Sequence, residues 1–381
     1  MSLRILQVAS GLPGWAGTEK QIMDSAPGLA RRGHEVTIAC QPGSEIERRA
    51  VLVGLPTVHL VMRYPHDWKQ LPNFVRAMRG RYDVVHIRGY RDYIVPAAAA
   101  RLARVPVVVM TRHLPHPFRS RFTAYVCSEI FYDGIIAVSD FVAGVMSKSG
   151  VNPKRIFVVK NGIDLSYWHP VADKNLRAEL GVPPGAFLVV AAGRLSPEKG
   201  FDVLLRAMVI AREKGLNAVC AIAGRGQESE SLERLRTALG LEQTVHLLGF
   251  RSDIRALFAA ADVVAAPSVS PETFGHSVLE GLACRRPVIA SGIGGFLEIV
   301  TSETGCLIPP SDPEALAEAM VELANAPERR QAMGEAGHRR AQEFSLDKCV
   351  QGIEAVYITL VRRRLEASRA KPQSSTPCRP N

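Results

Sequence analysis

Two glutamates stand out in residues 267–289, PSVSPETFGHSVLEGLACRRPVI, with seven residues between them. We expect Glu272 to lie in a loop and Glu280 in a helix that begins near Gly275 and runs through Cys284. The first-turn N–H groups of a helix have no partner within it, so this turn is a ready anion site. Carboxylates on both sides of such a site suit a sugar nucleotide, whose hydroxyl groups lie at both ends of a diphosphate. A glutamate pair alone is typical of a solvated helix, but this context predicts a donor site comprising Glu272, Phe274, Gly275, His276, Ser277, Val278 and Glu280.

A second candidate segment is AGRLSPEKGF, residues 192–201, which follows an apolar strand and turns at Gly193. Arg194 and Lys199 bracket this turn. A guanidinium and an ammonium there can neutralise a diphosphate leaving group, a role that a metal ion fills in other transferases. The alternative is ordinary surface charge beside a capping serine. Because the chain contains no Asp-x-Asp, we predict that no metal is required.

Two glycine-rich loops are further candidates for nucleotide contact. Gly224 and Gly226 lie in a Gly-x-Gly loop between an expected strand and helix, and with Gly193 they would let the backbone approach the donor. Ser229 occupies the place of the third glycine of a dinucleotide fingerprint, so the loop is weak evidence for NAD. The other loop, residues 11–17, ends at Gly17, which we also assign to the donor site. Tight connection of a strand to a helix would explain these glycines equally well.

Basic residues follow two expected strands in the first half of the chain. His113 comes after the strand at 106–110, and although a lone histidine is more often structural, we take it as a catalytic candidate. Arginines at neighbouring strand ends in a basic domain indicate an anionic acceptor. The predicted acceptor-binding residues are Arg88, Arg91, Arg112 and Arg119, with His116 and Arg121 beside them.

Strands that alternate with helices must position these residues. We expect strands at 3–9, 35–40, 57–62, 83–87, 106–110, 134–138, 155–159, 187–192, 218–223, 244–248, 262–266, 287–290 and 305–308. This alternation predicts an α/β fold of two doubly wound parallel sheets, which bind ligands at the carboxyl ends of their strands. The predicted parts are an acceptor-binding domain at 1–165, a linker at 166–185, a nucleotide-sugar-binding domain at 186–344, a helix at 345–365 and a disordered basic tail at 366–381.

Composition narrows the class of protein. With 381 residues, of which 47% are apolar and 22% charged, the chain suits two folded domains. Seven scattered cysteines without Cys-x-x-Cys argue against a disulfide framework or zinc site and fit a reducing cytosol. No apolar stretch approaches the roughly 20 residues of a membrane helix, and we expect no secretory signal. These features predict a cytoplasmic protein.

The net charge of +10 is unevenly distributed. Residues 1–165 hold 22 Lys and Arg against 12 Asp and Glu, whereas residues 166–381 hold 25 of each. A basic surface attracts phosphates, acidic glycans, anionic membranes or nucleic acid. The basic run at 362–364 would assist docking at the inner face of the cytoplasmic membrane.

The motifs together resemble the retaining glycosyltransferases of family 4, which have the GT-B fold. The similarity covers nearly the whole chain and includes the glycine-rich first loop, RRGHEV at 31–36, NGID at 161–164, and Gly294, Gly295 and Glu298. It implies two Rossmann-like domains facing across a cleft, with the last helix crossing back to the first domain. Trp15 and Ala16 depart from the family's usual first loop, a change that would alter how the acceptor sits.

The resemblance also implies a role for each candidate residue. Glu272 and the amides after it would hold the donor sugar and diphosphate, and Glu280 would bind the ribose. Arg194 and Lys199 would hold the diphosphate, and His113 would lie near the transferred sugar. Arg194, Lys199, Glu272 and His113 are therefore the predicted catalytic residues.

The predicted function is transfer of a hexose-type sugar, with retention and without metal, from a nucleoside-diphosphate sugar that is most commonly UDP-linked. The expected acceptor is an anionic glycan or lipid-linked sugar, as in lipopolysaccharide or cell-surface polysaccharide biosynthesis. Three alternatives stay open at this point. A sugar-nucleotide epimerase of the same fold would need no acceptor, a nucleic-acid-binding protein would use the basic charge without any recognised nucleic-acid motif, and an NAD-dependent oxidoreductase would need an intact glycine fingerprint.

Overall fold

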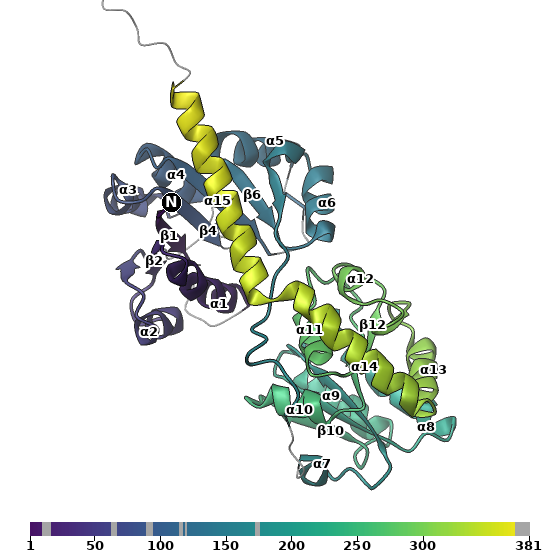
Figure 1. The fold of residues 1–381 in the computed structure, drawn as a ribbon. Helices are drawn as coiled ribbons and strands as arrows, with labels where there is room; N and C mark the ends of the chain where they lie inside the picture. Colours follow the sequence, from purple (N-terminus) through teal and green to yellow (C-terminus); the bar gives the residue numbers. More distant parts are fainter. Residues whose placement is uncertain are drawn as a thin grey trace, which may run out of the picture. The chain divides into compact units, whose positions relative to one another are not determined.

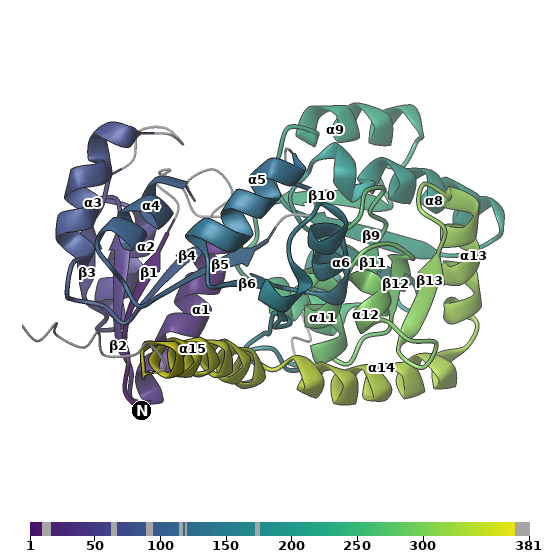
Figure 2. The ribbon, with the colours of Figure 1, turned by 90° about the horizontal axis from the view of Figure 1, so that it is seen from above.

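The computed structural model describes residues 1–9, 17–61, 67–88, 94–113, 117–118, 120–171 and 176–369. Contacts divide the chain into two compact units. The first comprises residues 1–138, 142–159 and the chain from Cys349 onwards, and the second comprises residues 139–141 and 160–348. Each unit carries one parallel sheet with helices around it (Figures 1 and 2). The predicted pair of doubly wound α/β domains is confirmed.

The first unit is built on seven strands in the order β3-β2-β1-β4-β5-β6-β7. Its central strands β4 and β5 have the sequences VVHIR and VVVMTR, which are mostly apolar, and every residue in both is buried. Helices on both faces explain this pattern, because a sheet covered on both sides needs no alternation of polar residues. The strands are β1 (Arg4–Val8), β2 (Glu35–Cys40), β3 (Thr57–His59), β4 (Val84–Arg88), β5 (Val107–Arg112), β6 (Gly134–Ala137) and β7 (Ile156–Val158).

The helices of the first unit include the last helix of the chain, α15 (Leu346–Arg369), which runs beside α1 (Figures 1 and 2). An added Cβ on Gly28 of α1 would lie 2.8 Å from a methyl group of Val350, so glycine permits this close packing. The other elements are α1 (Gly17–Arg31), α2 (Glu45–Leu52), α3 (Leu71–Met78), α4 (Ile94–Leu102), α5 (Arg121–Tyr125), α6 (Asp140–Lys148), the 3-10 turns η1 (Trp68–Gln70) and η3 (Pro153–Arg155), and the π-helical turn η2 (Val126–Phe131).

The second unit has six strands in the order β10-β9-β8-β11-β12-β13. The strands are β8 (Phe187–Ala192), β9 (Ala218–Ala223), β10 (Val245–Gly249), β11 (Val263–Ala266), β12 (Val288–Ser291) and β13 (Gly305–Ile308). The helical elements are α7 (Leu176–Glu179), η4 (Pro197–Lys199), α8 (Phe201–Glu213), α9 (Ser229–Ala238), α10 (Ile254–Ala260), α11 (His276–Ala283), α12 (Phe296–Ile299), α13 (Pro313–Ala324), α14 (Pro327–Ala341) and η5 (Gln342–Phe344). One apolar cluster lies on each face of this sheet.

The strand predictions are confirmed, with shifts only at the ends of strands. The segment expected to be a linker, 166–185, instead contributes Trp168, Leu176 and Leu180 to the core of the second unit. The expected tail also begins later than residue 366, because α15 continues to Arg369. Residues 362–369 are mostly good helix formers, which explains the extension; the remainder of the expected tail lies outside the described residues.

None of the described helices is long and apolar enough to span a bilayer. The six cysteines in the described part of the chain are free thiols.

Candidate functional site

The carboxyl ends of β8 and β11 bring the two predicted donor segments together. These strands are neighbours, and the chain proceeds outward from them to opposite edges of the sheet. Arg194 and Lys199 lie in the connection after β8, and Glu272 lies in the connection after β11. In open α/β sheets ligands bind at this point of reversal, because the connections diverge and leave a crevice.

An ion pair joins the two segments. Lys199 Nζ lies 2.6 Å from Oε1 of Glu272, and the hydroxyl of the buried Ser268 donates to the same oxygen at 2.8 Å. Both charged side chains are largely shielded from solvent, with 26% and 18% of their surface exposed. A phosphate that enters the site can therefore replace Glu272 as the partner of the Lys199 ammonium, and the Glu272 carboxylate is then available to accept hydrogen bonds from hydroxyl groups.

Gly200, whose backbone is in the left-handed region, allows the two loops to approach closely enough for this ion pair to form. Gly200 has φ +64°, and a Cβ added to it would lie 2.1 Å from the carbonyl oxygen of Pro267. The N–H of Val269 also donates to the carbonyl of Glu198 at 3.0 Å. The turn before α8 thus packs directly on the loop after β11, which holds Lys199 beside Glu272. Pro197 starts the short turn η4, which directly precedes α8.

Arg194 occupies the other end of the same turn and has a different environment. Its side chain is 71% exposed and pairs with Glu198 at 2.6 Å. Burial raises the pKa of Glu198, but hydrogen bonds from Ser196, the backbone and Arg194 lower it by more. The pKa of Glu198 is therefore below its usual value. Each predicted cation therefore has its own glutamate.

Helix α11 begins as predicted, with Gly275 as its N-cap residue at φ +116° and Cys284 as its C-cap. A Cβ on Gly275 would lie 2.6 Å from the Phe296 ring, so the entrance to the helix requires glycine. The first turn, which includes His276 and Ser277, supplies N–H groups beside the Glu272 loop. Glu280 lies in the second turn and is half-buried.

Two residues assigned to the donor site lie in the core. Phe274 is 1% exposed and packs edge-on against the rings of His276 and Phe344, and the side chain of Val278 is fully buried. Their side chains therefore stabilise the loop and the helix from within the core. The assignment of both residues to the donor site stays a prediction.

Gly294 and Gly295 pack directly against the backbone of the Glu272 loop. The N–H of Gly295 donates to the carbonyl of Glu272 at 2.7 Å. A Cβ on Gly294 would lie 2.3 Å from this carbonyl oxygen, and one on Gly295 would lie 2.6 Å from Cα of Phe274. The sequence identified this pair only through the family resemblance, and the structure supplies the physical reason for it.

The glycines of the β9 loop are explained by the protein's own chain. A Cβ on Gly224 would lie 1.8 Å from the carbonyl oxygen of Gly193, and one on Gly226 would lie 2.1 Å from that of Leu195. Of the predicted donor residues, Gly224 and Gly226 therefore serve to pack the β8 and β9 loops together. A Cβ on Gly193, by contrast, would make only an ordinary contact, 3.6 Å from Phe201. We had expected Gly224 and Gly226 to let the backbone approach a nucleotide, but the packing of the two loops already accounts for them.

Beside these loops lies a pocket that the sequence did not reveal. It has a volume of about 740 Å³ and is lined by residues that include Leu195, Arg225 and Leu247. The guanidinium of Arg225 lies 6.0 Å from the ring centre of Phe250, which is 68% exposed. A large exposed aromatic ring next to a donor loop is a surface on which a planar base can stack.

In the first unit, Arg88 and Arg112 end the adjacent strands β4 and β5. Both are buried strand residues rather than exposed loop residues, which corrects our expectation. Arg88 is 2% exposed, and burial lowers its pKa. Its Nη1 donates to the carbonyl of Gln21 at 3.2 Å, whereas Nε and Nη2 have no hydrogen-bond partner among the described residues. Arg112 lies over the ring of Phe118 at 4.6 Å.

A buried polar network lies beneath Arg88 and was not anticipated. His86 bonds to the hydroxyls of Tyr357 and, at 2.6 Å, Thr111, and the side-chain amide of Gln7 donates to Tyr357 at 2.9 Å. Burial lowers the pKa of His86 well below its usual value, and the charge of Arg88 adds to this effect. Because Tyr357 belongs to α15, this network fixes the last helix to the first sheet.

The other predicted residues of the first unit are only partly described. His113 directly follows β5 and is half-buried, and Arg121 begins α5 and is exposed. Gly17 is the first residue of α1, with no atom within 4 Å of an added Cβ. Arg91, His116 and Arg119 lie outside the described residues.

Comparisons with known proteins agree with this geometry. A sequence model of the family described as Glycosyltransferase Family 4 matches residues 15–167, and one described as Glycosyl transferases group 1 matches residues 172–340. The D-inositol 3-phosphate glycosyltransferase of Mycobacterium bovis is 31% identical, with 90% of this chain and 78% of that protein aligned. The protein of the same name from Segniliparus rotundus is 33% identical over 60% of this chain, a match that spans only 53% of that relative.

Solved structures show the same fold. Anabaena HepE in complex with UDP has a TM-score of 0.80 and 24% identity over 97% of this chain and all of its own. A glycosyltransferase from Rickettsia africae has a TM-score of 0.84 and 22% identity, covering 94% of this chain and 98% of its own. The expected GT-B fold is thereby confirmed, and the chain belongs to family 4 of the glycosyltransferases.

Proposed function

We propose that this protein transfers a hexose-type sugar from a nucleoside-diphosphate sugar, with retention and without a metal ion, to an acceptor that carries a phosphate or another anionic group. The observation that carries the proposal is the ion pair between Lys199 and Glu272, which lies at the carboxyl ends of β8 and β11. Next to it begins α11, whose first-turn N–H groups favour an anion. HepE, which shares the fold, has been crystallised with UDP-glucose.

In the proposed donor complex, Lys199 and the first turn of α11 hold the diphosphate, and Arg194 moves from Glu198 to join them. Glu272 then accepts hydroxyl groups of the sugar, and Glu280 accepts those of the ribose. The base occupies the pocket beside Arg225 and Phe250. The commonest donor base, uracil, is the one we expect.

The proposed transfer takes place on one face of the sugar. The bond between the anomeric carbon and the diphosphate oxygen breaks, the acceptor oxygen bonds to the same face of that carbon, and the acceptor's proton passes to the departing diphosphate. Lys199 and Arg194 stabilise the negative charge that develops on the leaving group. His113 would hydrogen-bond the transferred sugar.

Arg88 supports an anionic acceptor, because a buried guanidinium with two nitrogens that lack hydrogen-bond partners among the described residues is costly unless a ligand binds them. The relatives described above are named D-inositol 3-phosphate glycosyltransferase, a name that includes a phosphorylated compound. A lipid-linked or polysaccharide acceptor at the cytoplasmic membrane would present the same chemistry and belongs to this proposal.

A thermal-shift titration with UDP, GDP, ADP, CMP and NAD, with and without EDTA, tests the donor site. One nucleoside diphosphate should stabilise the protein by about 2.7 kcal/mol at 100 times its dissociation constant. The stabilisation should persist in EDTA and in Glu213→Ala, an exposed position on α8, and should disappear in Glu280→Ala. No response to any nucleotide, or one that requires metal, would contradict the proposal.

A further inference from the structure

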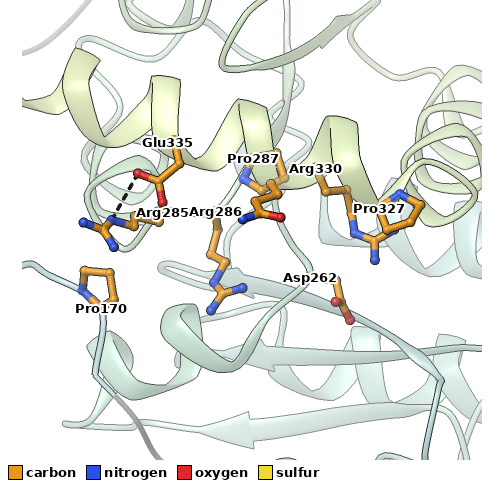
Figure 3. Close-up of a pocket in the computed structure, with 9 residues that line it drawn as sticks. Pro170, Asp262, Arg285, Arg286, Pro287, Pro327, Arg330 and Glu335 are labelled. Atoms are coloured by element: carbon orange, nitrogen blue, oxygen red, sulfur yellow. Dashed lines mark ion pairs between the residues drawn. The ribbon is translucent and has the colours of Figure 1, made fainter.

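Another pocket, lined by charged residues, lies at the amino ends of strands of the second sheet, whereas the proposed donor site lies at their carboxyl ends (Figure 3). Asp262 and Pro287, which line it, directly precede β11 and β12, so the pocket lies at the amino ends of these strands. Its volume is about 370 Å³. Three arginines contribute to it: Arg285 and Arg286 from the segment after α11, and Arg330 from α14. No step of the proposed transfer uses these residues.

Part of each arginine's bonding capacity stabilises the fold. Arg330 Nη1 donates to the carbonyls of Leu323 and Ala324 at 2.5 and 2.8 Å, where α13 ends. Arg286 Nη2 donates to the carbonyl of Ala259 near the end of α10. These contacts use one nitrogen of each guanidinium, although a guanidinium has five N–H groups.

One further nitrogen of Arg286 has no acceptor among the residues that the structure describes. Its Nε is buried and has no hydrogen-bond partner in the described part of the chain. Asp262, an acid of the pocket, is already engaged, because it pairs with Arg177 at 3.1 Å and accepts the N–H of Leu188 at 2.7 Å. Neither Arg286 nor Arg330 forms an ion pair with a described residue. Both guanidinium groups are therefore beyond ion-pair distance of the described carboxylates. Burial lowers the pKa of Arg286, and the charge of Asp262 offsets only part of this effect.

The other acid is placed at the rim. Glu335 of α14 contacts Arg285 at 3.5 Å, and both side chains are about half exposed. Figure 3 shows this pair to one side of the guanidinium groups of Arg286 and Arg330. An exposed ion pair of this length contributes little, so Arg285 can turn to a ligand at low cost.

We propose that this pocket binds a small phosphate-bearing anion through Arg286 and Arg330, with Arg285 at its rim. Phosphate is the favoured chemistry because a guanidinium group donates charge-assisted hydrogen bonds to phosphate oxygens, and the pocket is lined by more than one such group. The volume lies at the low end of the range for small-molecule sites. It suits free phosphate or a phosphorylated metabolite rather than a polymer.

Calorimetric titration of the full-length protein with inorganic phosphate, in chloride buffer of matched ionic strength, tests this proposal. Binding should persist in Lys199→Ala, which disables the proposed diphosphate site. It should weaken at least tenfold in the double variant Arg286→Gln with Arg330→Gln, in which the amides retain donors for the helix carbonyls. Failure to bind below about 10 mM phosphate, or loss of binding in Lys199→Ala alone, would overturn it. Because no nucleotide is used, failure of the proposed sugar transfer leaves this outcome unaffected.

A gain-of-function variant guards against misfolding of the double variant. Glu335→Gln removes a rim carboxylate from an exposed position and should tighten phosphate binding roughly two- to fivefold. Glu213→Gln, an exposed change on α8 outside the pocket, should leave the affinity unchanged. Equal affinities for Glu335→Gln and Glu213→Gln would contradict the proposal. Repeating the titration with a hexose phosphate distinguishes a free-ion site from a metabolite site, since tighter binding than inorganic phosphate identifies the latter.

Discussion

Both units carry cations at the carboxyl ends of their central strands, but the surroundings of these cations differ. In the second unit, Lys199 and Arg194 are each paired with a glutamate from the same or a neighbouring loop. In the first unit, Arg88 is buried, and two of its nitrogens have no partner among the described residues. A neutralised site can be held together by its own ion pairs, whereas a buried unpaired charge must be held by the surrounding fold. The two sites should therefore respond differently to substitution.

The largest expected effect concerns the backbone contact that assembles the second-unit site. Gly200→Ala should lower the free energy of unfolding by about 3 kcal/mol, because the methyl group meets the Pro267 carbonyl and the left-handed φ is strained. Gly215→Ala is the matched control, since Gly215 has a similar φ with open space around it, and should cost about 1 kcal/mol. Equal losses in urea unfolding would show that the close approach contributes nothing.

Lys199→Ala should reduce turnover by about 100-fold, because the leaving diphosphate loses its charge partner. The control is Lys214→Ala, which removes a lysine paired with Glu314 at the end of α8. Steady-state rates with saturating donor and acceptor distinguish the two variants. Wild-type turnover in Lys199→Ala would show that Lys199 and its ion pair with Glu272 have no role in catalysis. The contrast drawn above between the two units would then not concern catalysis.

Arg88→Met should lower kcat/KM for a phosphorylated acceptor by about 30-fold, because a charge-assisted hydrogen bond is lost. Nucleotide binding should be retained, since Arg88 belongs to the other unit. Arg31→Met, at an exposed position on α1, provides the control. An unchanged preference between phosphorylated and neutral acceptors would mean that Arg88 has a purely structural role.

The smallest effect concerns acid stability of the first unit. The pKa of His86 is lowered in the folded protein, so the unfolded state binds a proton at higher pH than the folded state does. Stability should therefore fall as pH decreases below about 6.5, by at most about 1.4 kcal/mol per pH unit. Urea midpoints between pH 7 and 5 should show a shallower dependence in His86→Gln and an unchanged one in His169→Gln, an exposed position. The same slope in all three proteins would exclude His86 as the cause.

Sequence reasoning predicted best what depends on local pattern. The apolar runs that form the strands and the N-terminus of α11 at Gly275 follow directly from residue type. The proximity of Lys199 to Glu272, which are 73 residues apart, followed from the rule that ligand-binding loops gather at the carboxyl ends of parallel strands.

What could not be predicted depends on contacts between distant parts of the chain. His86 and Tyr357 are 271 residues apart, and no local pattern indicates that they bond. The burial of Arg88 has the same origin, since helix α15 covers the sheet at that place. Gly224 and Gly226 illustrate a different limit, because their type was evident but the reason for it, packing on residues 193–195, required the structure.

The return of α15 to the first sheet also determines the order in which the protein is completed during synthesis. Tyr357, which closes the network around Gln7 and His86, leaves the ribosome after all of residues 160–348. Residues 160–348, by contrast, form nearly the whole second unit and emerge as one continuous stretch. Although domains near the N-terminus generally fold first, here the second unit has all of its segments available before the first unit does. The nascent first sheet must therefore persist with an uncovered face until α15 has emerged from the ribosome.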